Sequence, residues 1–166
     1  MIEVRDATPD DWPAMWAFMR GIVAAGDTFT YDPELGEAEA RAMWCNEPPG
    51  RTIVAVVDGV IAGTAEMERN RDGPGAHVAT ASFMVAPEHE GRGVGRALVE
   101  DVVRWARGEG YRGIQFNAVA ASNARAVGLY RSLGFEVVGT VPGGFLHPVE
   151  GYVGLHVMYR DLVSEP

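Results

Sequence analysis

The sequence has a single cysteine, Cys45, among its 166 residues. One cysteine excludes a disulfide within the chain and any metal site built from several cysteines. No stretch approaches the roughly 20 consecutive apolar residues that a membrane-spanning helix needs. Residues 1–6 (MIEVRD) lack the apolar segment of a signal peptide. We therefore expect a cytoplasmic protein that binds no metal and has no membrane partner.

Basic residues are also scarce, with 14 Lys and Arg against 23 Asp and Glu and a formal net charge of −9. This charge disfavours non-specific binding to nucleic acid. It slightly favours cationic substrates, although an acidic balance also serves solubility alone. Glycine, in contrast, is abundant at 21 residues. Such abundance indicates tight turns or places where the backbone approaches a ligand closely.

The first half of the chain predicts two helices and an antiparallel meander. Thr8 and Pro9 have the character of a helix cap and a first helical residue. The dipeptide Asp58-Gly59 is typical of a two-residue hairpin turn between β-branched segments. Helices are expected from Pro9 through Met19 and at 37–44, separated by a loop over 26–36, and strands at 2–5, 52–57, 60–67 and 76–85.

The second half alternates between helices and strands. Ser122 is expected to cap a helix that ends just before Gly134. Helices are predicted at 95–107 and 122–133, strands at 113–119, 135–141 and 152–159, and a loop over 142–151. The fold class is thus α/β of the α+β type, a mixed, mostly antiparallel sheet of about seven strands flanked by four helices. Because no linker is visible, we expect one domain over residues 1–166.

The most informative segment is VAPEHEGRGVGRAL, residues 85–98, in which a strand ends, a glycine-rich loop follows and a helix begins. Glycines remove the β-carbons that would keep an anion away from backbone amides at the positive end of a helix. Arg92 and Arg96 add positive charge, so a pyrophosphate suits this loop. A flexible turn is the alternative. The loop is not a Walker motif, because no Gly-Lys-Ser/Thr follows, and the preceding hairpins disfavour a dinucleotide-binding fold.

This segment resembles the signature of the GCN5-related N-acetyltransferase (GNAT) superfamily, which is Val-x-Pro, then Arg/Gln-x-x-Gly-x-Gly/Ala, then a helix. The matching residues are Val85, Pro87, Gly93 and Gly95. Glu90 differs, because it stands where the family usually has arginine or glutamine. A carboxylate beside a phosphate is unfavourable, and we expect Arg92 and Arg96 to offset it.

A second block resembles the later motif of the same family. It reads Asn123-x-x-Ala126-x-x-Leu129-Tyr130-x-x-x-Gly134-Phe135. The two motifs occur in the family's order and separation, and this coincidence makes the resemblance specific. It covers residues 2–162 and is weak before residue 52.

The resemblance implies an N-acetyltransferase with acetyl-CoA as cosubstrate, in which an amine attacks the thioester directly in a cleft between two splayed strands. A backbone amide near Val85 would stabilise the oxyanion. Cofactor contacts are implied for the strand, the glycine loop and the following helices, namely Phe83, Met84, Val85, Gly91, Arg92, Gly93, Val94, Gly95, Arg96, Asn123 and Tyr130.

Three catalytic candidates follow from the resemblance. Tyr130 is expected to protonate the departing thiolate, although it also suits packing on the sheet. Glu66 and Glu68 share one face of a strand, and we expect Glu66 to serve as the base, with solvated surface acids as the alternative. Asn117 is the third candidate, with a buried amide bonded to backbone as its alternative. Asn123 is expected to orient the coenzyme or to cap its helix.

The acceptor end has weaker signals. Asn117, Asn123 and the run Thr140-Val141-Pro142 look similar to fungal azetidine-2-carboxylate acetyltransferases. The loop ending in Phe29 looks similar to the substrate loop of phosphinothricin-type acetyltransferases. Both resemblances imply a small, amino-acid-like amine that contacts Phe29 and Asn117. A polyamine, antibiotic or protein N-terminus is the alternative acceptor, and a noncatalytic CoA-binding sensor or an interaction domain is the alternative class. The resemblance also allows a homodimer.

Overall fold

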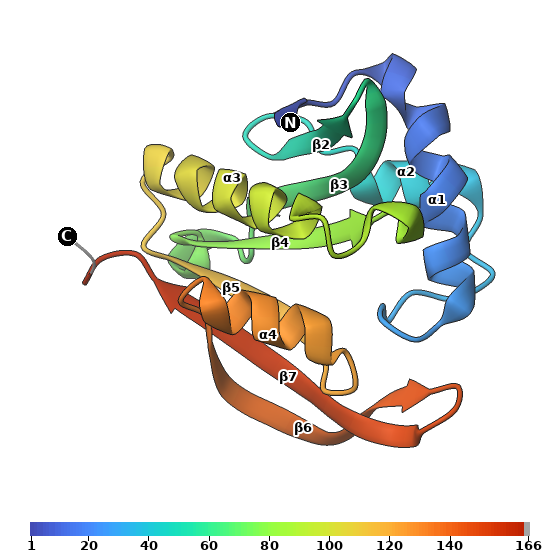
Figure 1. Cartoon of the computed structure of the whole chain (residues 1–166). Helices are drawn as coiled ribbons and strands as arrows, with labels where there is room; N and C mark the ends of the chain where they lie inside the picture. Colours follow the sequence, from blue (N-terminus) through green and yellow to red (C-terminus); the bar gives the residue numbers. More distant parts are fainter. Residues whose placement is uncertain (165–166) are drawn as a thin grey trace.

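The computed structural model describes residues 1–164. A seven-stranded sheet with the order β1-β2-β3-β4-β5-β7-β6 forms its centre (Figure 1). Neighbouring strands are antiparallel except for the parallel pair β4 and β5. The strands are β1 (Ile2–Asp6), β2 (Arg51–Val57), β3 (Val60–Arg69), β4 (Val78–Val85), β5 (Gly113–Ala120), β6 (Glu136–His147) and β7 (Gly151–Asp161). The expected mixed, mostly antiparallel sheet is confirmed.

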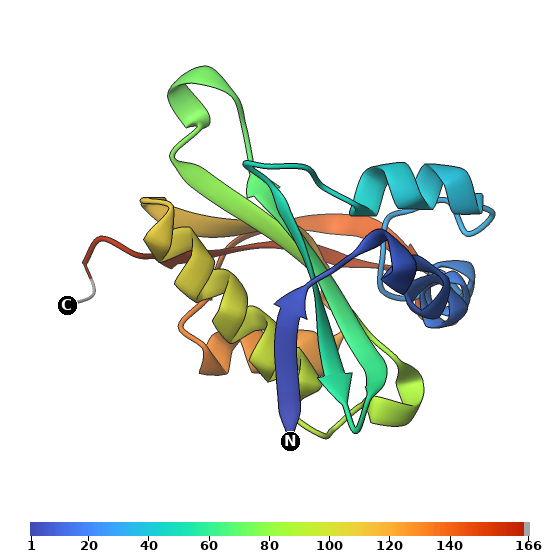
Figure 2. The ribbon, with the colours of Figure 1, turned by 90° about the horizontal axis from the view of Figure 1, so that it is seen from above.

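The helices flank both faces of the sheet, with α3 and α4 on one face and α1 and α2 on the other (Figures 1 and 2). The helix start predicted at Thr8-Pro9 is a short 3-10 turn over Pro9–Asp11, and the first α-helix follows it directly. The four helices of the described chain are α1 (Trp12–Ala25), α2 (Glu37–Trp44), α3 (Val94–Gly108) and α4 (Ala124–Ser132). Within residues 1–164, no helix combines the length and the apolar character needed to cross a membrane.

Each face of the sheet buries its own core. Beneath α3 and α4, the alternate residues Ala79 and Ala81 of β4 pack with Leu98 and Val102 of α3. Beneath α1 and α2, Met84 of β4 packs with buried side chains that include Met15, Met19 and Trp44. The alternation of β4 side chains between the two cores follows from the twofold period of a strand.

The parallel pair β4 and β5 is short. Only Val78 with Gly113 and Ala79 with Ile114 are in register, after which the two strands diverge. On its other side β4 stays paired with β3 as far as Val85. The remainder of β4 thus has an edge without a strand partner in the middle of the sheet, and this opening positions the site described below.

The predicted loop over residues 142–151 is wrong, because β6 continues through it to His147 and pairs with β7. A proline removes a ladder donor, but an edge strand tolerates one where its outer side is unpaired. Here β6 is the edge of the sheet, and the register shifts between Val141 and Phe145, which places Pro142 in a bulge. The edge position, which depends on the whole topology, overrides the local glycine and proline signal.

The predicted cap Ser122 is also wrong. Asn123 precedes α4, and its side-chain oxygen accepts a hydrogen bond from the Ala126 backbone amide at 3.3 Å. The Ser122 hydroxyl is buried without a hydrogen-bond partner in the described chain. Serine and asparagine both commonly cap helices, so local sequence does not decide between Ser122 and Asn123. The path of the chain decides it, because the chain makes a tight turn between β5 and the helix.

Candidate active site

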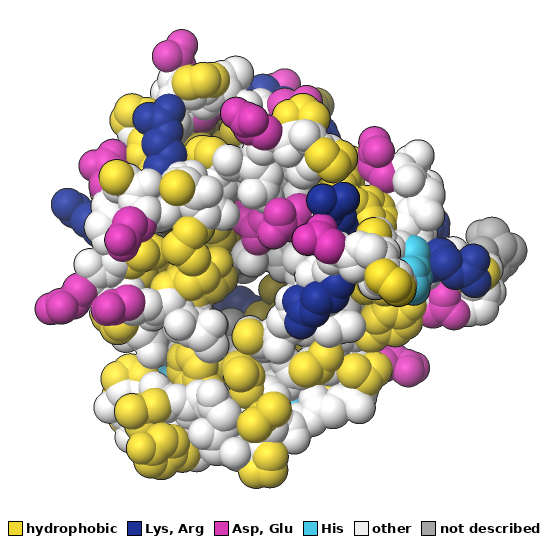
Figure 3. Space-filling model, turned by 180° about the vertical axis from the view of Figure 1, so that it is seen from behind, with side chains coloured by type: hydrophobic (Ala, Val, Ile, Leu, Met, Phe, Trp, Pro, Cys, Tyr) yellow, Lys and Arg dark blue, Asp and Glu magenta, His cyan; other side chains and the backbone are white. Residues whose placement is uncertain are grey.

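A cleft of about 640 Å³ opens where β4 and β5 diverge. The space-filling view shows a hollow near the middle of the molecule's far face, with apolar, acidic and basic side chains around it (Figure 3). The cleft is lined by most of the predicted site residues, namely Phe29, Phe83, Met84, Val85, Gly91, Gly93, Val94, Gly95, Arg96, Asn117, Asn123 and Tyr130. Glu66 and Arg92 are not among its lining residues.

One part of the cleft, called here the glycine end, is lined by residues 83–85, 87, 89–91 and 93–96. Gly91 and Gly93 have φ values of 72° and 87°, in the region that glycine adopts without strain. α3 begins directly after Gly93, whose carbonyl accepts the first helical hydrogen bond from Ala97. The amides at residues 94–96 therefore have no helical acceptor, and the positive end of the helix adds to them. This arrangement fits a diphosphate.

The arginines near the glycine end differ in position. Arg96 lines the cleft and donates to the Ser132 hydroxyl at 2.9 Å. Arg92 lies outside the lining, with Nη1 at 3.4 Å from Nδ1 of His89. Arg125, in the first turn of α4, lines the cleft and forms an ion pair with Glu90. The expected offset of the Glu90 charge therefore comes from Arg125, which lies 35 residues further along the chain.

Tyr130 of α4 lies among aromatic rings, with centroids at 4.6 Å from Phe116 and 6.0 Å from Phe83. Its side chain also lines the cleft, so packing and access to a ligand coexist. Burial raises the pKa of the Tyr130 hydroxyl above its ordinary value. The hydroxyl is therefore protonated at neutral pH and available as a donor.

Glu66 is a buried carboxylate on β3, with 8% of its surface exposed. Its Oε2 accepts a hydrogen bond from Nδ2 of Asn46 at 2.7 Å. Burial raises the pKa of Glu66, while contacts with Ser82 and Asn46 favour its charged form. Glu68, on the same strand face, is exposed. The surface alternative thus holds for Glu68 and is wrong for Glu66.

Ser82 connects Glu66 to the cleft. It faces Glu66 across the β3–β4 ladder and lines the cleft itself. Tyr31, from the loop after α1, also lines the cleft, and its hydroxyl interacts with Ser82. Burial, and secondarily the charge of Glu66, raises the pKa of Tyr31. Sequence reasoning missed both residues, although Tyr31 lies in a loop already singled out for Phe29.

The part of the cleft around Ser82, called here the hydroxyl end, is polar. It comprises Thr28–Tyr31, Thr80, Ser82 and Asn117. The Phe29 ring stacks on Tyr31 with centroids 5.3 Å apart. The Thr28 hydroxyl oxygen is buried without a hydrogen-bond partner among the described residues. A buried unpaired hydroxyl is costly unless a ligand or water satisfies it.

Asn117 is exposed on β5, so the alternative of a buried amide bonded to backbone is wrong. A register shift between Phe116 and Val119 frees this stretch of β5 from β7. The Asn117 amide donates to Oδ1 of Asn70 at 2.6 Å and its oxygen accepts from Gln115 at 2.9 Å. These side-chain contacts fix Asn117 at the rim of the cleft.

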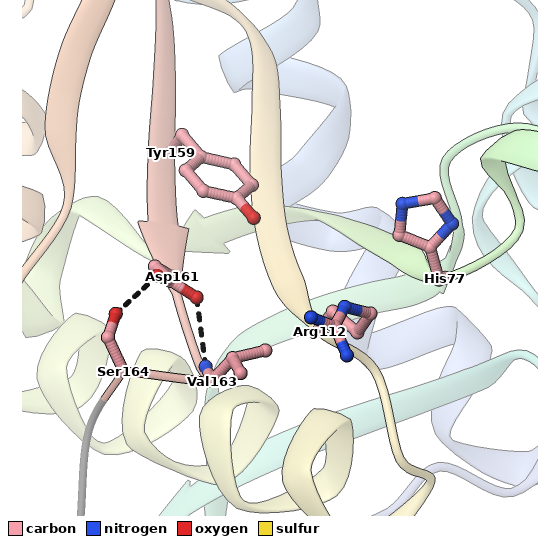
Figure 4. A pocket seen from close by; sticks show the side chains of 6 residues that line it. All are labelled: His77, Arg112, Tyr159, Asp161, Val163 and Ser164. Atoms are coloured by element: carbon pink, nitrogen blue, oxygen red, sulfur yellow. Dashed lines mark hydrogen bonds between the residues drawn. The ribbon is translucent and has the colours of Figure 1, made fainter.

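A second, smaller hollow of about 300 Å³ lies near the end of β7 (Figure 4). It is lined by His77, Arg112, Tyr159, Asp161, Val163 and Ser164. Asp161 accepts hydrogen bonds from the Ser164 hydroxyl and the Val163 amide, so its carboxylate serves the local turn. Within residues 1–164, no cluster of three or more His, Cys, Asp or Glu could hold a metal.

A mixed sheet that splays beside a glycine loop and a helix N-terminus defines the N-acetyltransferase fold. The chain belongs to the acetyltransferase (GNAT) family, whose model matches residues 16–135. A GCN5-related N-acetyltransferase from Kribbella flavida is 58% identical, with a TM-score of 0.94 and a match that covers 97% of this chain and 98% of that chain.

Two more distant similarities are a curated relative and a solved structure that shares the fold. The L-amino acid N-acyltransferase MnaT of Escherichia coli is 31% identical over 91 residues, which are 54% of this chain and 52% of MnaT. The match spans about half the length of three curated relatives and a smaller share of four others. A phosphinothricin acetyltransferase from Sinorhizobium meliloti, solved in complex with AcCoA, shares the fold at 22% identity with a TM-score of 0.86, over 96% of this chain and 88% of that chain.

Proposed function

We propose that the protein is an acetyl-CoA-dependent N-acetyltransferase that acetylates the amine of a small, amino-acid-like molecule. One observation carries the proposal. A single cleft joins a row of free helix-end amides, an unpaired strand edge and the protonated hydroxyl of Tyr130. Family membership supports it, since this order of parts suits a long thioester with phosphates at one end and a leaving sulfur at the other.

The glycine end would hold the coenzyme. The amides around Gly93 and Gly95 would bind the diphosphate, and the free edge of β4 at Phe83–Val85 would pair with the amide groups of the pantetheine arm. Asn123 lines the same cleft while its oxygen caps α4, so its side-chain nitrogen is the atom left to face the ligand. Acetyl-CoA supplies the reactive thioester.

Acyl transfer then needs an oxyanion donor and a proton for sulfur. A backbone amide near Val85 would stabilise the oxyanion, because donors fixed before the reaction cost no reorganisation. Tyr130 would donate its phenolic proton to the thiolate as the carbon–sulfur bond breaks. Burial keeps the hydroxyl protonated in the free protein and also makes it a weaker acid than an exposed tyrosine.

The amine must lose a proton before or as it attacks. Glu66 would accept it indirectly, through the hydroxyls of Tyr31 and Ser82. The amine gives its proton to Tyr31, which passes its own to Ser82, which passes its own to the Glu66 carboxylate. The raised pKa of Glu66 makes its carboxylate a stronger base than an exposed one.

The acceptor would occupy the hydroxyl end. Thr28 offers an unsatisfied hydroxyl and Phe29 an apolar surface, and Asn117 offers amide atoms at the rim. The similarity to MnaT, named for L-amino acids, and the shared fold with a phosphinothricin acetyltransferase support a small amino-acid-like amine. A polyamine, an antibiotic or a protein N-terminus is the alternative acceptor.

The test is a panel of amines with acetyl-CoA, scored by the free thiol that turnover releases. The panel pairs each L-amino acid with its amide and with its N-acetyl form, adds polyamines and N-terminal peptides, and includes an amine-free blank. Cys45 is exposed and adds at most one thiol per chain, which the blank measures. Turnover with one amino-acid class supports the proposal. Binding of CoA without turnover across the panel would instead identify a sensor.

A further inference from the structure

Glu90 and Arg125 face each other across the glycine end of the cleft. Glu90 lies directly before Gly91, and Arg125 lies in the first turn of α4. Their side chains form an ion pair, and both line the cleft. The pair therefore links the loop to α4 beside the free amides of α3.

The charges at this place need an explanation. An unpaired carboxylate next to a diphosphate would weaken binding, because like charges repel strongly at short range. Here a cation accompanies the carboxylate, and it comes from α4. The pair is also largely solvated, with 67% of the Arg125 side chain and 47% of the Glu90 side chain exposed. Exposed ion pairs contribute little stability and open readily.

We propose that Arg125 is a phosphate-binding residue of the coenzyme site, held over the glycine loop by Glu90 until a phosphate takes the place of the carboxylate. This inference rests on the proposed use of acetyl-CoA. A guanidinium binds phosphate in a bidentate manner, which favours the phosphate over an exposed carboxylate. Glu90 then keeps Arg125 beside the loop in the free protein, and breaking this exposed pair costs little when the coenzyme binds.

The other arginines are less suited to this task. Arg96 is engaged with Ser132 and lies 3.8 Å from Glu100. Arg92 lies beside His89 and is not among the residues that line the cleft. Arg125 alone of the three is tied to an acid within the cleft itself, so binding of an anion there exchanges one partner for another.

Calorimetric titration of the full chain with CoA tests the proposal. Arg125→Gln should weaken binding about tenfold, the loss expected for one charge-assisted hydrogen-bonded contact. Arg131→Gln is the matched control, because Arg131 is exposed on the same helix and does not line the cleft. It removes the same charge and should change the dissociation constant less than twofold. Melting curves verify that each variant is folded.

A double-mutant cycle separates phosphate binding from simple neutralisation. Glu90→Gln should bind CoA as well as the unmodified protein or more tightly. If Arg125 contacts phosphate, Arg125→Gln should still weaken binding at least fivefold in the Glu90→Gln background. If Arg125 only offsets Glu90, its substitution in that background should match Arg131→Gln, and the proposal is overturned.

The source of the phosphate is read from shortened ligands. Dephospho-CoA keeps the diphosphate and lacks the ribose phosphate, and S-acetylpantetheine lacks all three phosphates. If Arg125→Gln no longer weakens the binding of dephospho-CoA, Arg125 binds the ribose phosphate. If Arg125→Gln still weakens the binding of dephospho-CoA, Arg125 binds the diphosphate. The effect must vanish with S-acetylpantetheine, because an effect there would show a structural role and overturn the proposal. Absence of CoA binding to the unmodified protein would instead reject the proposed function.

Discussion

At the glycine end of the cleft the groups open to a ligand are backbone amides around Gly93, fixed by the start of α3. At the hydroxyl end they are side chains, among them Tyr31 and Ser82, backed by the buried Glu66. Backbone donors tolerate most side-chain changes but depend on the loop conformation. Side-chain donors survive changes of the backbone nearby but depend on each hydroxyl and carboxylate. Substitutions at the glycine end should therefore lower the affinity for acetyl-CoA, and substitutions at the hydroxyl end should lower the rate of acyl transfer.

The largest effect is expected from Gly93→Val. Gly93 has φ of 87°, which a β-branched residue adopts only with strain. The loop should shift, and loss of two charge-assisted amide contacts would weaken acetyl-CoA binding about 100-fold. Calorimetry measures the dissociation constant. Gly110→Val is the control, since Gly110 has φ of 81°, open surroundings and a place outside the cleft. Equal affinities in the two variants would contradict the amide cradle.

Tyr130→Phe tests the proposed proton donor of the cleft. The ring and its packing stay, so the turnover number should fall about 100-fold while KM for acetyl-CoA changes little. The loss should shrink at low pH, where solvent protonates the thiolate more readily. Tyr111→Phe is the matched control, because Tyr111 packs on Trp105 outside the cleft. Full turnover in the Tyr130 variant would leave protonation of sulfur to water.

Glu66→Gln probes the side-chain end. We expect kcat/KM for the amine to fall about tenfold at neutral pH. In the unmodified protein kcat/KM should fall as pH drops through the raised pKa of Glu66, and this limb should be absent from the variant. Glu68→Gln changes an exposed acid on the same strand and should leave the profile intact. Identical pH profiles for all three proteins would remove Glu66 from the reaction.

Glu66 also gives a stability signature. Its pKa is raised in the folded state, so the folded protein binds this proton more readily than the unfolded chain. The contribution of Glu66 to stability is therefore present below the ordinary glutamate pKa of about 4.3. It is lost as pH rises through the raised value. Denaturant unfolding as a function of pH should show a flatter curve for Glu66→Gln than for Glu68→Gln.

The smallest effect is expected at Asn123, which caps α4 and lines the cleft between the two ends. Asn123→Ala removes the cap of this helix and should lower the free energy of unfolding by about 1 kcal/mol. For a chain of this size the melting temperature should fall by roughly 2–4 °C. Asn123→Asp keeps the cap and should recover most of this loss. If the aspartate variant restores stability but not CoA affinity, the side-chain nitrogen contacts the coenzyme.

The contrast between the two ends also explains what the sequence could predict. Glycines, a following helix and Tyr130 lie in short motifs that resemble those of the family, so the proposed cradle and proton donor could be predicted from local sequence. The ion pair of Glu90 and Arg125, 35 residues apart, depends on how α4 packs against the loop. The burial of Glu66 depends on Asn46 from a distant segment. Neither distance in space could be read from a motif.

The fold also has some features that local sequence predicts and others that depend on the whole topology. Segments rich in β-branched residues and turn residues such as Asp58-Gly59 predicted all seven strands of the sheet, because both are local properties of the sequence. The length of β6 was wrong because a strand through Pro142 is acceptable only at a sheet edge. The helix cap at Asn123 instead of Ser122 depended on the exit of the chain from β5.

The short parallel contact between β4 and β5 has a consequence for exchange with solvent. Interior strands usually protect their amide hydrogens on both sides, but β4 loses its partner after Ala79. Amides on that free edge should exchange with deuterium quickly for the centre of a sheet. A ligand that hydrogen-bonds to the edge would act as the missing strand and slow the exchange. Hydrogen exchange along residues 80–85 would then report occupancy of the cleft directly, without any turnover.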